Sequence, residues 1–145
     1  MDDQILTAAA TASAFRRRTQ ALRVVLLLDL GRAVMVDCDA SGTEVTDEDA
    51  ITTVTTDAQP KPLPDIRPTP ASAISIDTAT GELAAPIGTI DHLAQAVTAL
   101  AQAFGGRTVA TAEFATSDPE LPITLAAREG EPVVLQAGDA HYQLG

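Results

Sequence analysis

Five consecutive large aliphatic residues, Val24 to Leu28, place the strongest constraint on the fold of this chain. An uninterrupted aliphatic run of this length is typical of a central strand that is buried on both faces of a sheet. Gly31 and Arg32 are expected to turn the chain, and Ala33 to Cys38 to form a strand paired with the first. Burial of both faces requires helices on the two sides of the sheet or a second subunit on one of them.

The second constraint is an amphipathic helix predicted over residues 89–104. Thr89 is the expected N-cap, and Gly105 with Gly106 the C-terminal stop. The other faces of this helix carry no Lys, Arg or Glu. The favoured interpretation is an amphipathic helix that lies on a sheet and has a weakly polar back; the alternative is that this back meets another chain. The apolar residues that recur at steps of three and four are Ile90, Leu93, Val97, Leu100 and Phe104.

The remaining segments predict an α+β fold. Residues 3–20 are rich in Ala and are expected to form an N-terminal helix, although Thr7, Thr11 and Ser13 would also suit a strand. After Gly106 come four short strand candidates, and the turn-forming residues between them favour an antiparallel meander. These candidates are residues 108–115, 121–127, 132–136 and 140–144, with a further short strand expected at 73–77. We predict a mainly antiparallel sheet of about five to seven strands with both helices packed on it.

A single domain, 1–145, is expected. A chain of 145 residues buries enough surface to fold without a metal or a disulfide. Residues 57–71 hold five of the nine prolines and are interpreted as an extended connector. The sequence shows no internal repeat.

The net charge of the chain restricts the chemical class of molecule that it can bind. The net charge is −11, and residues 33–60 contain seven acidic residues with no Lys or Arg. Such a field repels nucleic acid and attracts a basic protein or a cation. We therefore expect any partner to be a protein, by its charge a basic one, contacted through Glu44, Asp47 and Asp49.

The segment Asp37 to Glu48 resembles the calcium-binding loop of EF-hand proteins. Oxygen-bearing side chains stand at its first, third and fifth positions, Gly42 at the sixth and Glu48 at the twelfth. The resemblance implies Asp37, Asp39, Ser41, Thr43 and Glu48 as ligands and a helix leaving the loop. The sequence departs from the family at the eighth position, where Glu44 replaces the usual apolar residue, and upstream, where a strand is expected instead of a helix. The alternative is an acidic turn without a cation.

Motifs of catalysis are absent from the sequence. It contains no GxSxG, P-loop, GxGxxG, HExxH or CxxC pattern, and its two histidines, His92 and His141, stand far apart. An enzyme is therefore the less favoured class, and a small enzyme or small-molecule binder at one of these histidines ranks third. The single cysteine excludes an internal disulfide and fits a reducing compartment. The start lacks the basic region of a secretion signal, and the run 24–28 is too short to span a bilayer, so we expect a cytoplasmic location without membrane contact.

The leading functional hypothesis is a non-catalytic acidic interaction or regulatory protein that acts through protein contacts. A calcium-binding module built on residues 37–48 is the alternative. We also expect a homo-oligomer, formed through a helix face or a sheet face, because the run 24–28 and the uncharged back of the helix 89–104 both call for cover.

Overall fold

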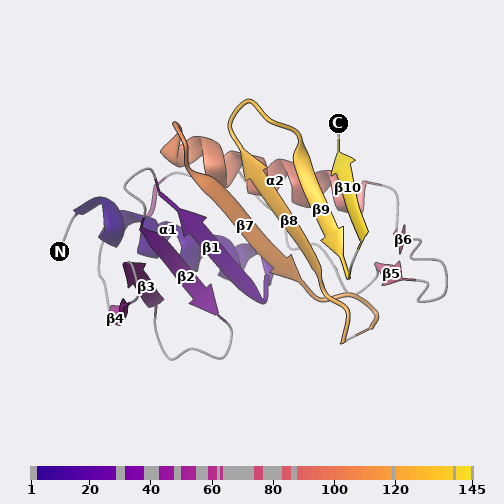
Figure 1. The fold of residues 1–145 in the computed structure, drawn as a ribbon, viewed down its shortest axis with the longest axis horizontal. Coiled ribbons are helices and arrows are strands. Elements are labelled where there is room, and N and C mark those ends of the chain that lie inside the picture. Colours follow the sequence, from indigo (N-terminus) through magenta and orange to yellow (C-terminus); the bar gives the residue numbers. More distant parts are fainter. Residues whose placement is uncertain are drawn as a thin grey trace.

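The α+β class is confirmed by a computed structural model, which describes residues 3–28, 32–37, 43–47, 50–54, 59–61, 63, 74–76, 83–85, 88–118, 120–138 and 140–144. Within these ranges the chain forms two helices, α1 (Asp3–Thr19) and α2 (Thr89–Phe104), and a large antiparallel sheet (Figure 1). The N-terminal segment is a helix, as expected, with Arg16, Arg17 and Arg18 in its last turn.

The sheet has eight strands in the order β10-β9-β8-β7-β1-β2-β3-β4, and all neighbours run antiparallel. The strands are β1 (Arg23–Leu27), β2 (Ala33–Asp37), β3 (Thr43–Asp47), β4 (Ala50–Val54), β7 (Val109–Phe114), β8 (Ile123–Arg128), β9 (Val133–Ala137) and β10 (Ala140–Leu144). A separate two-stranded ladder joins β5 (Ser75–Ile76) to β6 (Leu83–Ala84). The count exceeds the predicted five to seven because residues 43–54, expected to hold a loop and a short element, form a hairpin. Those two segments are rich in the β-branched residues Thr, Val and Ile, which favour strands.

The architecture is an internal duplication. Each half is a helix followed by a four-stranded meander: α1 precedes β1 to β4, and α2 precedes β7 to β10. The halves join where β1 pairs with β7, and Val25 lies opposite Thr111 in the middle of both strands. The strand order is therefore symmetric about this pair. An approximate two-fold axis perpendicular to the sheet, between β1 and β7, relates one half to the other. The sequence shows no internal repeat, so the two halves share their architecture without recognisable sequence similarity.

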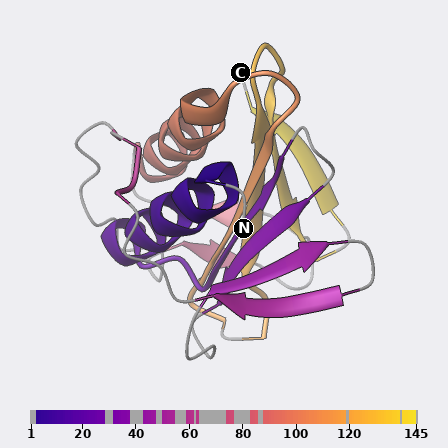
Figure 2. The ribbon, with the colours of Figure 1, turned by 90° about the vertical axis from the view of Figure 1, so that its left-hand side faces the viewer.

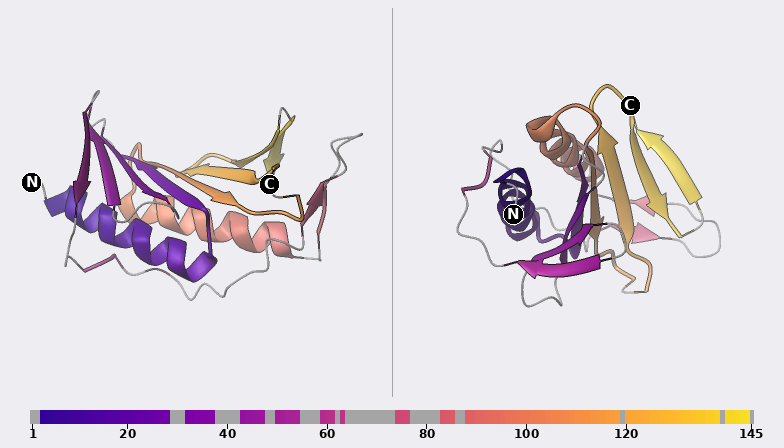
Figure 3. Two further views of the ribbon diagram at one scale, coloured as in Figure 1. Left: turned by 90° about the horizontal axis from the view of Figure 1, so that it is seen from below. Right: turned by 60° about the vertical axis from the view of Figure 1, so that its left-hand side comes forward.

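Both helices pack against the same face of the sheet (Figures 2 and 3). Helix α1 lies on β1, β2 and β3, and α2 lies on β7 and β8. The face of α1 toward the sheet is mostly alanine, which lets the helix approach the strands closely, with Ile5 and Phe15 filling the remaining space. Ser13 shares a hydrogen bond of 3.2 Å with Thr43 of β3 and so ties this helix to the third strand.

The ends of α2 agree in part with the prediction. Thr89 is not the N-cap: it is the first helical residue and is buried, while Gly88 occupies the cap position with φ +85° and no side-chain cap hydrogen bond. A left-handed φ of this size suits glycine, which has no Cβ to clash with the backbone. The C-terminal stop is confirmed, because the Gly105 N–H donates to the Ala101 carbonyl at 3.0 Å.

Most side chains of α2 are buried or half-buried within the chain. Only Asp91, Gln95 and Gln102 of the helix are exposed. Part of the cover comes from the segment around Lys61, whose ammonium lies 5.0 Å from the centre of the Phe104 ring. The same residue donates its backbone N–H to Thr11 Oγ1 of α1 at 2.9 Å. Helix α2 thus agrees with the favoured interpretation, an amphipathic helix that lies on the sheet with a weakly polar exposed side.

The connector predicted at 57–71 falls largely outside the described residues. Leu63, one of the few described there, packs against the core. Neither α1 nor α2 is long and apolar enough to cross a bilayer.

Candidate interaction face

The strand predicted to be buried on both faces has one buried and one open face. Val24, Leu26 and Leu28 are buried under the helix layer, whereas Val25 is half-buried and Leu27 is 46% exposed. The prediction of two covered faces is thus wrong for the single chain. The reason is the position of α2, which lies beside α1 on the same side and leaves the opposite face of the sheet without a helix in the described part of the chain (Figure 3).

We call the uncovered side the open face. Directly paired residues of neighbouring strands point to the same side of a sheet. Val25 is paired with Met35 of β2 and Thr111 of β7, and Thr111 is paired in turn with Ala126 of β8. Two residues further along β1, on the same side of the sheet, Leu27 is paired with Ala33 and Val109. The apolar patch of the open face consists of Val25, Leu27, Ala33, Met35, Val109 and Ala126.

Charged residues border the apolar patch. Arg23 binds Asp37 of β2 through Nε at 2.9 Å and Nη2 at 2.6 Å, and it is also in register with Glu113 of β7. Glu44 of β3 is paired with Met35, and Arg128 of β8 with Val109. The side chains of Arg23 and Asp37 are 48% and 22% exposed, so their ion pair contributes about 0–1 kcal/mol to folding. Its clearer effect is to hold the guanidinium over the sheet beside the patch.

The open face is nearly neutral in a strongly acidic protein. Among the residues that the structure describes there, the charged ones are two arginines and three acids, which sum to −1, whereas the whole chain carries −11. An apolar centre with a mixed polar border is the usual anatomy of a protein-binding surface.

The residues of the predicted calcium loop lie at a β-hairpin. Asp37 ends β2 and Thr43 begins β3, while Asp39, Ser41 and Glu48 lie outside the described residues. The element that leaves the loop is a strand, so the expected exit helix is wrong. The alternation of side chains along β3 explains why Glu44 stands where an EF-hand loop has an apolar residue. Val45 points into the core, and Glu44 points to the open face. Among the described residues no group of three or more His, Cys, Asp or Glu side chains is placed to hold a metal. Calcium binding stays a prediction.

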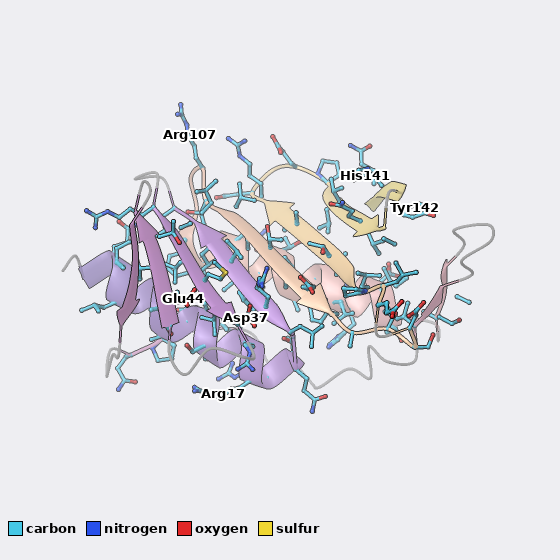
Figure 4. All side chains as sticks on the ribbon, turned by 60° about the horizontal axis from the view of Figure 1, so that its bottom comes forward. Arg17, Asp37, Glu44, Arg107, His141 and Tyr142 are labelled. Atoms are coloured by element: carbon cyan, nitrogen blue, oxygen red, sulfur yellow. The ribbon has the colours of Figure 1, made fainter. Side chains whose placement is uncertain are left out.

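Of the acidic residues predicted to bind a partner, Glu44 lies on the open face. Glu44 is half-buried in the middle of β3 next to Met35, and Asp47 is the last residue of that strand. Asp49 is outside the described residues. Figure 4 shows Glu44 and Asp37 on neighbouring strands, with Arg17 at the far edge of the molecule beyond them.

The two histidines are on different layers. His92 belongs to the first turn of α2, whereas His141 is exposed on the edge strand β10, in register with Gln136 on the side away from the helices (Figure 4). The structure does not bring them together as one polar site.

Comparison of the chain with protein-family models, with curated proteins and with solved structures finds no match.

The apolar patch itself was missed by sequence reasoning. The run Val24 to Leu28 predicted that both faces of this strand are buried, but nothing in the run shows that Leu27 is exposed in the single chain. The alternation in β7, where Ala110, Ala112 and Phe114 are buried and Val109 and Thr111 are not, carries the only local signal for the second half of the patch.

Proposed function

We propose that this protein is a non-catalytic interaction module that binds a protein partner through the open face of its sheet. The observation that carries the proposal is the apolar patch of that face, in which Leu27, the last residue of the central strand β1, is 46% exposed. An exposed apolar surface with a polar border is typical of a protein-interaction site.

Burial of the patch by a partner would supply the missing cover of β1. Each square ångström of apolar surface removed from water contributes about 25 cal/mol, so the aliphatic side chains of the patch favour association. The ion pair between Arg23 and Asp37 and the neighbouring Glu113 would provide the polar contacts that orient a partner.

The acidic segment 33–60 has a separate role in this proposal. Its seven acidic residues favour basic proteins over nucleic acid and membranes, and they keep the protein apart from the many acidic macromolecules of the cytoplasm. A basic partner held by Glu44, Asp47 and Asp49 would dissociate as salt rises, because charges at the surface are screened within about 10 Å at ~0.1 M.

Site-specific photo-crosslinking in living cells tests the proposal. A photoreactive amino acid replaces Leu27 or Val109 on the open face, and Gln95 or Gln102 on the exposed side of α2 serves as the matched control. Crosslinks to protein from the open-face positions, absent from the helix positions, are the expected result. Equal crosslinking from both surfaces, or none from Leu27 and Val109, would contradict an interaction through this face.

A further inference from the structure

We propose that the partner of the open face is a second copy of this chain, packed face to face as a symmetric dimer. The inference rests on the proposed function and names the partner. In this dimer the two sheets form the inner layers, and the helices of each copy lie on the outside.

The symmetry of the sheet defines one favourable arrangement. A two-fold axis between the two sheets, parallel to the strands and midway between β1 and β7, places β1 of one copy over β7 of the other. It also places β2 over β8. Because β1 and β7 are paired in register from Arg23 with Glu113 to Leu27 with Val109, the residues keep their level along the strands. The sheets then pack in the aligned manner of β-sandwiches, about 30° apart.

Side-chain sizes are complementary in this arrangement. Met35 faces the partner's Ala126, a long side chain against a short one. Ala33 faces the partner's Arg128, again short against long, and Leu27 faces the partner's Val109. Two sheets that pack face to face fill the space between them by such interdigitation. The open face therefore matches its own copy without any change in sequence.

Charges are complementary as well. Arg23 faces the partner's Glu113, and the symmetry makes this contact twice. A two-fold axis perpendicular to the strands would instead set Arg23 against the partner's Leu27 and Glu113 against the partner's Val109, so both opposite-charge contacts would be lost. The charged residues described on the open face sum to −1, so two copies that meet through these residues repel one another little, whereas a basic protein would find little negative charge among them.

The area of the face indicates a reversible dimer. Six strands at about 4.8 Å spacing and five residues at about 3.4 Å rise give a face on the order of 500 Å² per copy. A total of roughly 1,000 Å² is at the lower end of specific protein interfaces. We therefore expect exchange between monomer and dimer at micromolar concentrations.

Sedimentation equilibrium of the full chain, from low micromolar to submillimolar concentration, tests the dimer. The mass should rise from 15.0 kDa to twice that value. Leu27→Lys places a charge on the most exposed side chain of the patch and should weaken dimerisation by about 50-fold or more. Tyr142→Lys is the matched control: it changes the other exposed large apolar residue, which is 38% exposed on β10 and in register with Leu135 on the helix side. This control should dimerise as the wild type does.

Mixing two charge variants tests the arrangement. In Arg23→Glu the two contacts across the axis become Glu with Glu, and in Glu113→Arg they become Arg with Arg, so each variant alone should dimerise about tenfold or more weakly. An equimolar mixture restores one opposite-charge contact in each direction and should form a heterodimer. Mixing the variants does not change the like-charge neighbours that each has within its own chain. Recovery of dimerisation in the mixture therefore reports contacts between the two chains.

Three results would overturn the inference. They are a wild type that stays a monomer throughout, a dimer that Leu27→Lys leaves intact, and a mixture of the charge variants that stays monomeric. Far-ultraviolet circular dichroism of every variant separates lost association from lost folding. Crosslinks from the open face to a protein of another mass, together with a monomeric wild type, would keep the proposed function and reject the second copy as partner.

Discussion

Two neighbouring leucines of β1 provide a direct measure of the one-sided burial of the sheet. Leu26 is fully buried under the helix layer, whereas Leu27 is 46% exposed on the open face. Replacing a leucine by alanine removes three carbon groups, each contributing about 0.8 kcal/mol when it is buried. The same substitution at these adjacent positions should therefore have very different effects.

Leu26→Ala should lower the free energy of unfolding by about 3–4 kcal/mol, since the transfer term of about 2.4 kcal/mol is increased by the cavity left in the core. Leu27→Ala should lower it by about 1 kcal/mol, because roughly half of this side chain is already in water and an open surface leaves no cavity. Total stabilities of domains are about 5–15 kcal/mol, so the difference is readily measured.

Urea denaturation followed by far-ultraviolet circular dichroism is the suitable assay, because the chain has no tryptophan for fluorescence. At a protein concentration below that of dimerisation, equal losses for Leu26→Ala and Leu27→Ala would refute the one-sided cover of β1. At high concentration, Leu27→Ala should lose the extra stability that the wild type gains from association. Leu26→Ala should retain that gain.

Further predictions concern the loops, the cation and the ionic strength. Gly88→Ala should destabilise the fold by roughly 1–2 kcal/mol through its φ of +85° alone, since an added Cβ meets no atom within 4 Å, and Gly88→Asn should cost less. Thr116→Val should cost about 1–3 kcal/mol in urea denaturation, because the buried hydroxyl donates to the Leu121 carbonyl at 2.8 Å, and Thr116→Ser is its control. Millimolar calcium should change the melting temperature no more than magnesium does, because Asp37 is already paired with Arg23; a calcium-specific rise abolished by Glu48→Gln would support the cation site instead. Dimerisation should strengthen as salt rises, measured by sedimentation, because screening reduces the repulsion between two copies of charge −11.

Local sequence patterns predicted most of the elements. The steps of three and four from Ile90 to Phe104 place α2 at the observed residues, and Gly105 ends it as expected. The four strand candidates after α2 correspond to β7, β8, β9 and β10 within two residues at each end. These signals are short-range, because helix and strand periods and turn residues act within a few positions of the chain.

The candidate interaction face could not be predicted in the same way. It depends on the pairing of β1 with β7, whose partners Val25 and Thr111 are far apart in the sequence. It also depends on α1 and α2 packing on the same side of the sheet. Glu44 illustrates the difference, because its position in an acidic loop pattern suggested a cation site, whereas its place in β3 puts it on the open face.

By itself, the sequence determined the helices, most of the strands and the acidic character of this protein, since these follow from composition and from patterns a few residues long. The tertiary structure decided the duplication, the eight-stranded order and the side on which the helices lie. Long-range strand pairing and helix packing require only that buried positions match in volume and polarity, so two halves with different residues adopt the same architecture. For the same reason, the run Val24 to Leu28 showed that both faces of β1 are apolar, and only the assembled sheet showed which of them stays exposed.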